Sequence, residues 1–170
     1  MNDNTPHDIP ALLEQMSGQL RELLGQQELE QAAMLGIHTG GAWVARELHR
    51  QLGLSTPLGS LDISFYRDDF SRIGMHPQVR PSELPFEVED RTILLVDDVL
   101  QSGRTIRAAM NEIFDYGRPA RIILVVLVER SGRELPIQPD VCGLHIHLAP
   151  KHQIKLIGPE QLKLQIQEVS

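Results

Sequence analysis

The stretch ILLVDDVLQSGRT, residues Ile93–Thr105, decides the fold. It begins with an apolar run of the kind found in buried strands, and the run ends in two adjacent carboxylates, Asp97 and Asp98. A short loop of small, hydroxyl-bearing and glycine residues follows, and an amphipathic pattern begins at Thr105. Backbone N–H groups in such a loop, and the positive end of the next helix, attract a phosphate. This order of features predicts a pocket for a phosphorylated sugar.

The residues after this stretch predict a βαβ unit. Helical spacing continues to Tyr116 and ends at Gly117, and a second strand is expected over 121–128. This second run is too continuously apolar for a sheet with one wet face, so both strands belong to a buried parallel sheet. We therefore predict an α/β fold with a central, mostly parallel sheet flanked by helices. Its ligand site should lie at the carboxyl ends of the strands.

The first 65 residues continue the alternation of helices and strands. Apolar spacing predicts a helix over 11–24, entered at Pro10 and left at Gly25. A strand over 31–37, a turn over 38–41, a helix over 42–52 and a strand over 58–65 are expected next.

Two segments depart from this alternation. Charges, prolines and a glycine over about 66–90 predict a long flexible arm, and long loops inside compact domains are usually functional. From about 137 to 170, short strand-like pieces broken by proline and glycine predict a small C-terminal hood. The 170 residues together are expected to form a single domain.

Composition narrows the class of protein. The hydrophobic fraction of 41% and the charged fraction of 23% are ordinary for a globular protein. No apolar run reaches the roughly 20 residues that cross a bilayer, and the N-terminal residues do not have the pattern of a signal peptide. The only cysteine, Cys142, is expected to be a small apolar filler in a reducing cytoplasm. The net charge of −7 argues against strong nonspecific affinity for nucleic acid.

The acid pair has two interpretations. Asp97 and Asp98 could cap the following helix and orient its loop, or they could hold a ribose diol directly or through hydrated Mg²⁺. The loop that follows them favours the second interpretation, because hydroxyls and backbone amides then converge on a 5′-phosphate. The expected substrate-binding residues of this segment are Val99, Leu100, Gln101, Ser102, Gly103, Arg104 and Thr105.

The segment over 96–105 resembles the phosphoribosyl-pyrophosphate (PRPP) motif of type I phosphoribosyltransferases. Three further segments resemble, more narrowly, the PyrR-type pyrimidine operon regulators that have uracil phosphoribosyltransferase activity. They are LDISFYRDD over 61–69, YGRPA over 116–120 and VERSGRELPI over 128–137. The resemblance covers roughly residues 11 to 157 and implies a type I phosphoribosyltransferase fold.

The resemblance implies transfer of ribose 5-phosphate from PRPP to uracil, which gives UMP and pyrophosphate, with Mg²⁺ as cofactor. It implies catalytic roles for Asp97, Asp98 and Arg67, with Arg67 on the arm that closes over the reaction. The two aspartates would hold the metal through water or the ribose. Further substrate contacts are implied for Thr39, Gly40, Gly41, Arg130 and Ile154, the last two at the base.

One position departs from the family pattern. The segment His38-Thr39-Gly40-Gly41 aligns with the pyrophosphate loop, where family members usually have Thr-Arg-Gly, so Gly40 replaces an arginine. The substitution removes a cationic contact to pyrophosphate, although the backbone N–H groups of the loop can still donate hydrogen bonds to it. The alternative function is therefore a nucleotide-sensing, RNA-binding regulator with weak or no catalysis.

The family's second function is regulation of pyrimidine genes through operon messenger RNA, controlled by uridine nucleotides such as UMP and UTP. Arg133, Lys151 and Lys155 are the candidate RNA contacts, with Arg130, His152 and His38 near them in the sheet-end loops. A solvated charged face is the competing interpretation. RNA binding on an acidic chain would need a homodimer, or a larger assembly, that gathers positive charge on one face.

Two other site types were weighed. The apolar run and acid pair also resemble the first strand of a phospho-receiver, but too few residues follow Asp98, and Val128 leads into Glu129 instead of an acceptor aspartate. His145 and His147 share one face of a strand, yet the sequence places no third ligand near them. Neither pattern predicts a site.

Overall fold

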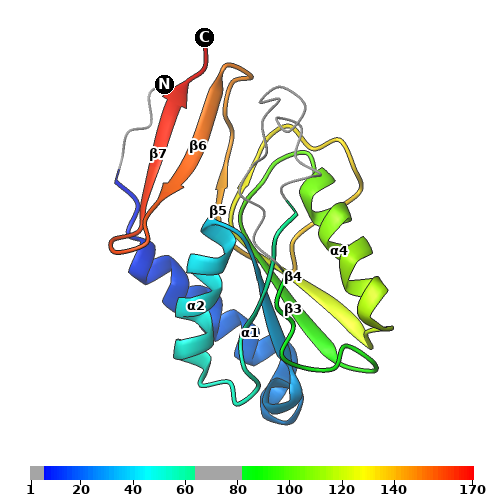
Figure 1. Cartoon of the computed structure of the whole chain (residues 1–170). Helices are drawn as coiled ribbons and strands as arrows, with labels where there is room; N and C mark the ends of the chain where they lie inside the picture. The colour runs from blue at the N-terminus through cyan, green and yellow to red at the C-terminus, as the bar shows by residue number, and fades with distance from the viewer. Residues whose placement is uncertain (1–5, 64–81) are drawn as a thin grey trace.

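The computed structural model describes residues 6–63 and 82–170 (Figure 1). Helices and strands alternate along most of the chain, as the sequence predicts. In chain order the elements are α1 (Ile9–Gln31), β1 (Ala33–Ile37), α2 (Gly40–Leu52), β2 (Gly59–Leu61), β3 (Thr92–Leu100), α4 (Arg104–Tyr116), β4 (Arg121–Arg130), β5 (Val141–Ile146), β6 (His152–Ile157) and β7 (Lys163–Glu168).

The central sheet has the strand order β2-β1-β3-β4-β5, and every neighbouring pair is parallel. The most apolar strands, β3 and β4, lie inside the sheet, where both of their faces are covered. Val96 of β3 is paired with Gly36 of β1 on one side and with Val125 of β4 on the other. The predicted α/β fold with a parallel sheet is confirmed, and the acid pair lies on its central strand.

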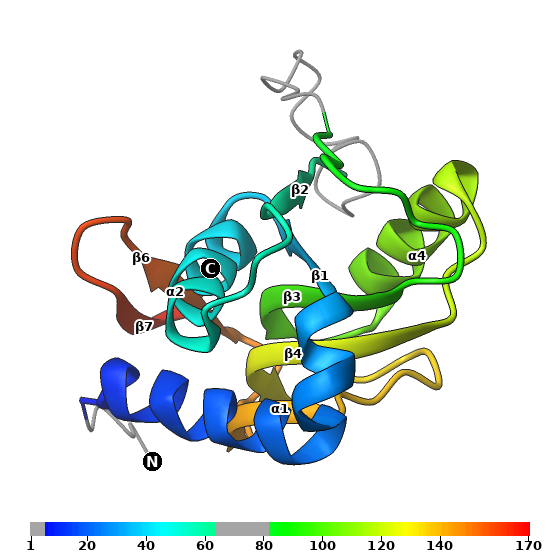
Figure 2. The ribbon, with the colours of Figure 1, turned by 90° about the horizontal axis from the view of Figure 1, so that it is seen from below.

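Helices cover both faces of this sheet. Helices α1 and α2 pack on one face and α4 on the other, as the view from below makes clear (Figure 2). Two hydrophobic clusters result, one centred on residues such as Leu20 and Leu48 and the other on Ile106 and Ile113. With both faces buried, the carboxyl edge of the sheet is the place where polar groups can meet a ligand.

Helix α1 is longer than the sequence predicts. Asp8 caps its start by accepting a hydrogen bond from the Ala11 N–H at 3.1 Å. Gly25 leaves helical geometry (φ 71°), but the helix resumes beyond this kink to Gln31 because Leu29 is buried against the core. The next strand therefore begins at Ala33 and not at Gln31. No helix in the described ranges combines the length and apolarity needed to cross a membrane.

The strands around the acid pair differ from the predicted bounds. The strand expected over 58–65 is described only as Gly59–Leu61, and residues 64 and 65 lie outside the described part. Strand β3 continues to Leu100, because β4 also extends and pairs Glu129 with Leu100. Asp97 and Asp98 are thus inside the strand and held by its ladder, not in the loop after it.

The C-terminal hood is smaller than the range 137–170 that the sequence predicts. Val141–Ile146 joins the central sheet as β5, and only the antiparallel hairpin β6–β7 stands apart from it (Figure 1). Ile154 and Leu156 of β6 are buried in the core cluster below. The sequence pattern of short apolar segments between prolines does not indicate which sheet each segment joins.

Most of the predicted arm, including Arg67, lies outside the described residues. Its described end is tied to the domain: Glu83 and Ser60 exchange backbone hydrogen bonds of 2.8 Å. The Ser82 hydroxyl accepts from the Asp62 N–H and donates to Glu112 of α4. These contacts fix where the arm returns to the sheet.

The buried face of α1 should carry much of the stability of this layer. Leu20 is fully buried, whereas Leu23 on the same helix is 45% exposed. Leu20→Ala should lower the free energy of unfolding by about 2–5 kcal/mol, because the cavity in the core is not refilled. Leu23→Ala is the matched control and should cost less than about 1 kcal/mol. Equal losses in urea unfolding of the two variants would contradict this packing.

Candidate functional site

A cavity of about 560 Å³ opens at the carboxyl end of β3, between the loops of the sheet and the hood strand β6. Its size is within the usual range for small-molecule sites. Segments that are far apart in the sequence form its wall. The lining residues are Thr39, Gly40, Trp43, Asp97, Asp98, Val99, Leu100, Gln101, Ser102, Gly103, Thr105, Ile106, Gln153, Ile154, Lys155 and Leu156.

The two acids are oriented by the backbone of their own strand. Asp97 is 3% exposed, and its Oδ1 accepts a hydrogen bond from the Asp98 N–H at 2.9 Å. Asp98 Oδ1 accepts from the Val99 N–H at 2.8 Å. Each carboxylate therefore has one oxygen engaged by the main chain, which restricts its rotation before any ligand arrives. Two fixed, adjacent carboxylates are a suitable support for a sugar diol or a hard cation.

Glycines at the start of α2 allow this helix to approach the acids closely. A Cβ atom at Gly40 would lie 2.2 Å from Asp98 Oδ2 and 2.8 Å from its Cγ. A Cβ atom at Gly41 would lie 2.8 Å from the Val96 carbonyl oxygen and 2.9 Å from the Asp97 Cα. Any side chain at these positions requires β3 or its carboxylates to move. An Asp98 carboxylate oxygen thus lies too close to admit a Cβ atom at Gly40.

The loop after β3 has the geometry of an anion site. Gly103 adopts a left-handed conformation (φ 93°) at the N-cap of α4, which a side chain would strain. The Ser102 carbonyl accepts the Glu134 and Leu135 N–H groups at 3.1 and 3.0 Å, which braces the loop. The first turn of α4 contains no acidic residue, so its dipole is not neutralised there. The loop and the helix end both favour a bound phosphate.

Arg104 and Gly41 of the predicted set are not among the lining residues. The Arg104 Nε atom forms an ion pair with Glu134 Oε2 at 2.9 Å, and both side chains are largely exposed. Gly41 is buried beneath Asp97, so it supports the acid from behind. The structure therefore divides the predicted residues between the cavity wall and its surroundings.

Arg130 is also absent from the cavity wall. Its side chain is buried, and it donates to the Ser131 carbonyl at 3.0 Å and to the His152 carbonyl at 2.6 Å. Burial lowers the pKa of this guanidinium. Because His152 begins β6, Arg130 connects the end of the central sheet to the hood. Its side chain therefore holds the hood strand in place without lining the cavity.

The hood and α2 supply lining residues that sequence reasoning did not assign to the site. Trp43 of α2 borders the cavity as well as the hydrophobic core. Lys155, a predicted RNA contact, lies in the same wall beside Ile154. Trp43 follows the Gly40-Gly41 pair by two residues, and this proximity is the signal that could have identified it.

Comparison with protein families matches the phosphoribosyl transferase domain over residues 6–160. Curated relatives named "Bifunctional protein PyrR" are similar along nearly the whole chain. The protein from Nitrosococcus oceani is 59% identical over 164 residues, which covers 95% of this chain and 93% of the relative. The protein from Pseudomonas fluorescens is 54% identical over 160 residues and covers 94% and 95%.

Solved structures agree in fold. A hypoxanthine phosphoribosyltransferase from Staphylococcus aureus has a TM-score of 0.66 at 17% identity, covering 86% of this chain and 78% of that one. A purine phosphoribosyltransferase from Pyrococcus horikoshii has a TM-score of 0.60 at 20% identity, covering 89% and 93%. The fold expected from the sequence is confirmed, and the chain belongs to the phosphoribosyl transferase domain family and, within it, to the bifunctional PyrR proteins.

Proposed function

We propose that this protein transfers ribose 5-phosphate from PRPP to uracil, giving UMP and pyrophosphate. The observation that carries the proposal is the convergence of Asp97, Asp98 and the phosphate-type loop in one cavity. In the reaction the bond from sugar C1 to pyrophosphate oxygen breaks, and a bond from C1 to uracil nitrogen forms. The nitrogen releases its proton to solvent or to pyrophosphate. The family membership supports the transferase class.

In this proposal the parts of the ligand are divided among four regions of the cavity. The amides of 102–105 and the end of α4 take the 5′-phosphate, and the two acids take the ribose hydroxyls. The backbone of Thr39 and Gly40 faces the pyrophosphate side. Trp43 and β6 enclose the base, which backbone groups near Ile154 can recognise because uracil is small and flat.

The residues present fit Mg²⁺. Asp97 and Asp98 offer hard oxygen donors on a single strand, and the outward oxygen of Asp98 lies beside the Thr39-Gly40 segment. When bound with PRPP, the ion would neutralise the charge of the leaving pyrophosphate. The chain's own part is to hold both reactants in line, to place fixed dipoles around the developing charge and to exclude water. Arg67 is a further catalytic candidate on the arm.

The second proposed activity is regulation of pyrimidine genes through messenger RNA, with UMP and UTP as signals in the same cavity. Arg133, Lys151 and Lys155 are exposed, and Lys155 links the basic group to the cavity wall. A homodimer in the cytoplasm would bring two such groups to one face. The word "bifunctional" in the relatives' name supports a second role of this kind.

Loss of one acid should abolish turnover. Asp98→Asn keeps the shape of the side chain but removes a charge that supports the ribose and the metal, so kcat/KM for UMP formation should fall at least about a hundredfold. Asp115→Asn, an exposed change on α4, is the control and should leave turnover unchanged. Wild-type UMP binding without any UMP formation would favour the non-catalytic regulator. Neither binding nor turnover would reject both proposals.

The close approach of Gly40 to Asp98 gives a second prediction. Gly40→Ala places a Cβ atom where Asp98 Oδ2 lies, so the carboxylate must rotate away from the Val99 N–H. We expect kcat/KM for PRPP to fall about tenfold or more. Gly18→Ala, where no atom lies within 4 Å of the added Cβ, is the control. Unchanged kinetics in Gly40→Ala would contradict the contact.

RNA binding should separate from turnover. The double variant Arg133→Gln/Lys151→Gln should weaken binding to pyrimidine-operon leader RNA and flatten its dependence on log salt by about 0.7 for each charge removed. UMP formation should not change. Arg50→Gln, at the far end of α2, serves as the control for net charge. A salt slope that is the same in all three proteins would rule these residues out as the RNA contacts.

A further inference from the structure

A second cavity, of about 700 Å³, lies on the β5 side of the sheet, between α1 and the ends of β4 and β5. Its wall includes Glu129, Asp140, Cys142 and His145, with Leu23 of α1 opposite. Among the residues that the structure describes, the two cavities share no lining residue. The proposed transferase reaction makes no use of any of these side chains.

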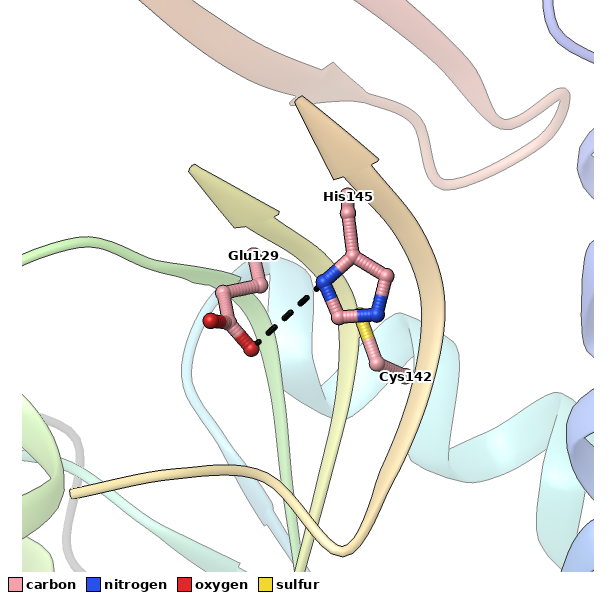
Figure 3. Close-up of side chains that lie close together, drawn as sticks. All are labelled: Glu129, Cys142 and His145. Atoms are coloured by element: carbon pink, nitrogen blue, oxygen red, sulfur yellow. Dashed lines mark ion pairs between the residues drawn. The ribbon is translucent and has the colours of Figure 1, made fainter. Parts of the chain in front are cut away.

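Three potential metal ligands come together in this wall. Glu129 of β4 and His145 of β5 are register partners, and Cys142 lies three residues earlier on β5. Their ligand atoms all lie within 4.8 Å of one another, and His145 Nδ1 is 3.7 Å from Glu129 Oε2. Figure 3 shows the carboxylate, the imidazole and the sulfur side by side at the two strands.

The donor set indicates the kind of ion. A thiolate, an imidazole and a carboxylate together are typical ligands of Zn²⁺, whereas Mg²⁺ and Ca²⁺ prefer oxygen alone. Tetrahedral bonds of about 2.0–2.3 Å place neighbouring ligand atoms roughly 3.3–3.8 Å apart. The His145–Glu129 separation of 3.7 Å is a few tenths of an ångström longer than the roughly 3.4 Å expected for nitrogen and oxygen ligands of one ion. The Cys142 sulfur lies within 4.8 Å of both of the other ligand atoms.

We propose that Glu129, Cys142 and His145 form a binding site for Zn²⁺ or a similar divalent transition metal, with its fourth position open to the cavity. The exposed His145 ring gives the ion access from solvent. Burial above all raises the pKa of the Cys142 thiol. Metal binding releases the thiol proton to solvent, and the ion then neutralises the thiolate beside the Glu129 carboxylate.

The site has a structural link to the nucleotide cavity. Glu129 is paired with Leu100, which lines that cavity, and it is followed by Arg130, which holds the hood strand through the His152 carbonyl. The ion requires none of the residues assigned to the transferase reaction. A chain that binds no Zn²⁺ could therefore still form UMP, and a chain without turnover could still bind the ion.

Cobalt(II) titration of the full chain tests the site, because a thiolate bound to cobalt gives a charge-transfer band that oxygen ligands at Asp97 and Asp98 cannot give. We expect the band to saturate at one equivalent per chain and Zn²⁺ to displace it. Cys142→Ser should abolish the band. His145→Gln and Glu129→Gln should weaken Zn²⁺ affinity at least about tenfold, as measured against a chromophoric chelator.

His147→Gln and Asp98→Asn are the controls and should keep the band at full strength. His145 is an exposed side chain, so its replacement tests the site without disturbing the core, and circular dichroism melting verifies the fold of each variant. Absence of the band in the wild type would overturn the proposal. So would metal affinity that is the same in Cys142→Ser and in the wild type.

Discussion

The start of α2 lies directly against the two acids of β3, and the rest of the site depends on this contact. Gly40 and Gly41 have no side chains, so the helix backbone reaches within contact distance of Asp98 and Asp97. A Cβ atom at either position would overlap strand atoms by more than normal packing allows. The contact fixes the distance between the Thr39-Gly40 loop and the carboxylates of Asp97 and Asp98. A single Cβ atom added at Gly40 or Gly41 would therefore displace the start of α2 and the carboxylates of β3 together.

The sheet order converts this local contact into a cavity. Because β3 is central and parallel to its neighbours, its carboxyl end is flanked by the loops after β1 and β4. The hairpin β6–β7 then closes the open side, held by the buried Arg130 guanidinium through the His152 carbonyl. One end of the cavity is lined by the loop over 102–105 at the start of α4, and another by Trp43 and residues of β6. A nucleotide likewise has a charged phosphate at one end and a flat, less polar base at the other.

The central strands and the loop at the cavity could be predicted from the sequence, because residues adjacent in the chain determine them. The apolar runs of β3 and β4, the acid pair and the loop before α4 are continuous in the chain, and the family resemblance rests on them. The predictions that were wrong, for the end of α1 and for the sheet that β5 joins, depend on packing between distant segments. Leu29 extended α1 past Gly25, and β5 joined the central sheet through its register with β4. Glu129, Cys142 and His145 come together only through that register, so no spacing along the chain could reveal the trio.

The crystal structure of the complex with UMP tests the central claim most directly. We expect the 5′-phosphate to lie over the amides of 102–105 at the start of α4 and the ribose hydroxyls to face Asp97 and Asp98. We also expect the uracil ring to lie between Trp43 and β6. Electron density that placed the phosphate in the cavity lined by Cys142, or that showed the loop after β3 closed by its own side chains, would contradict it.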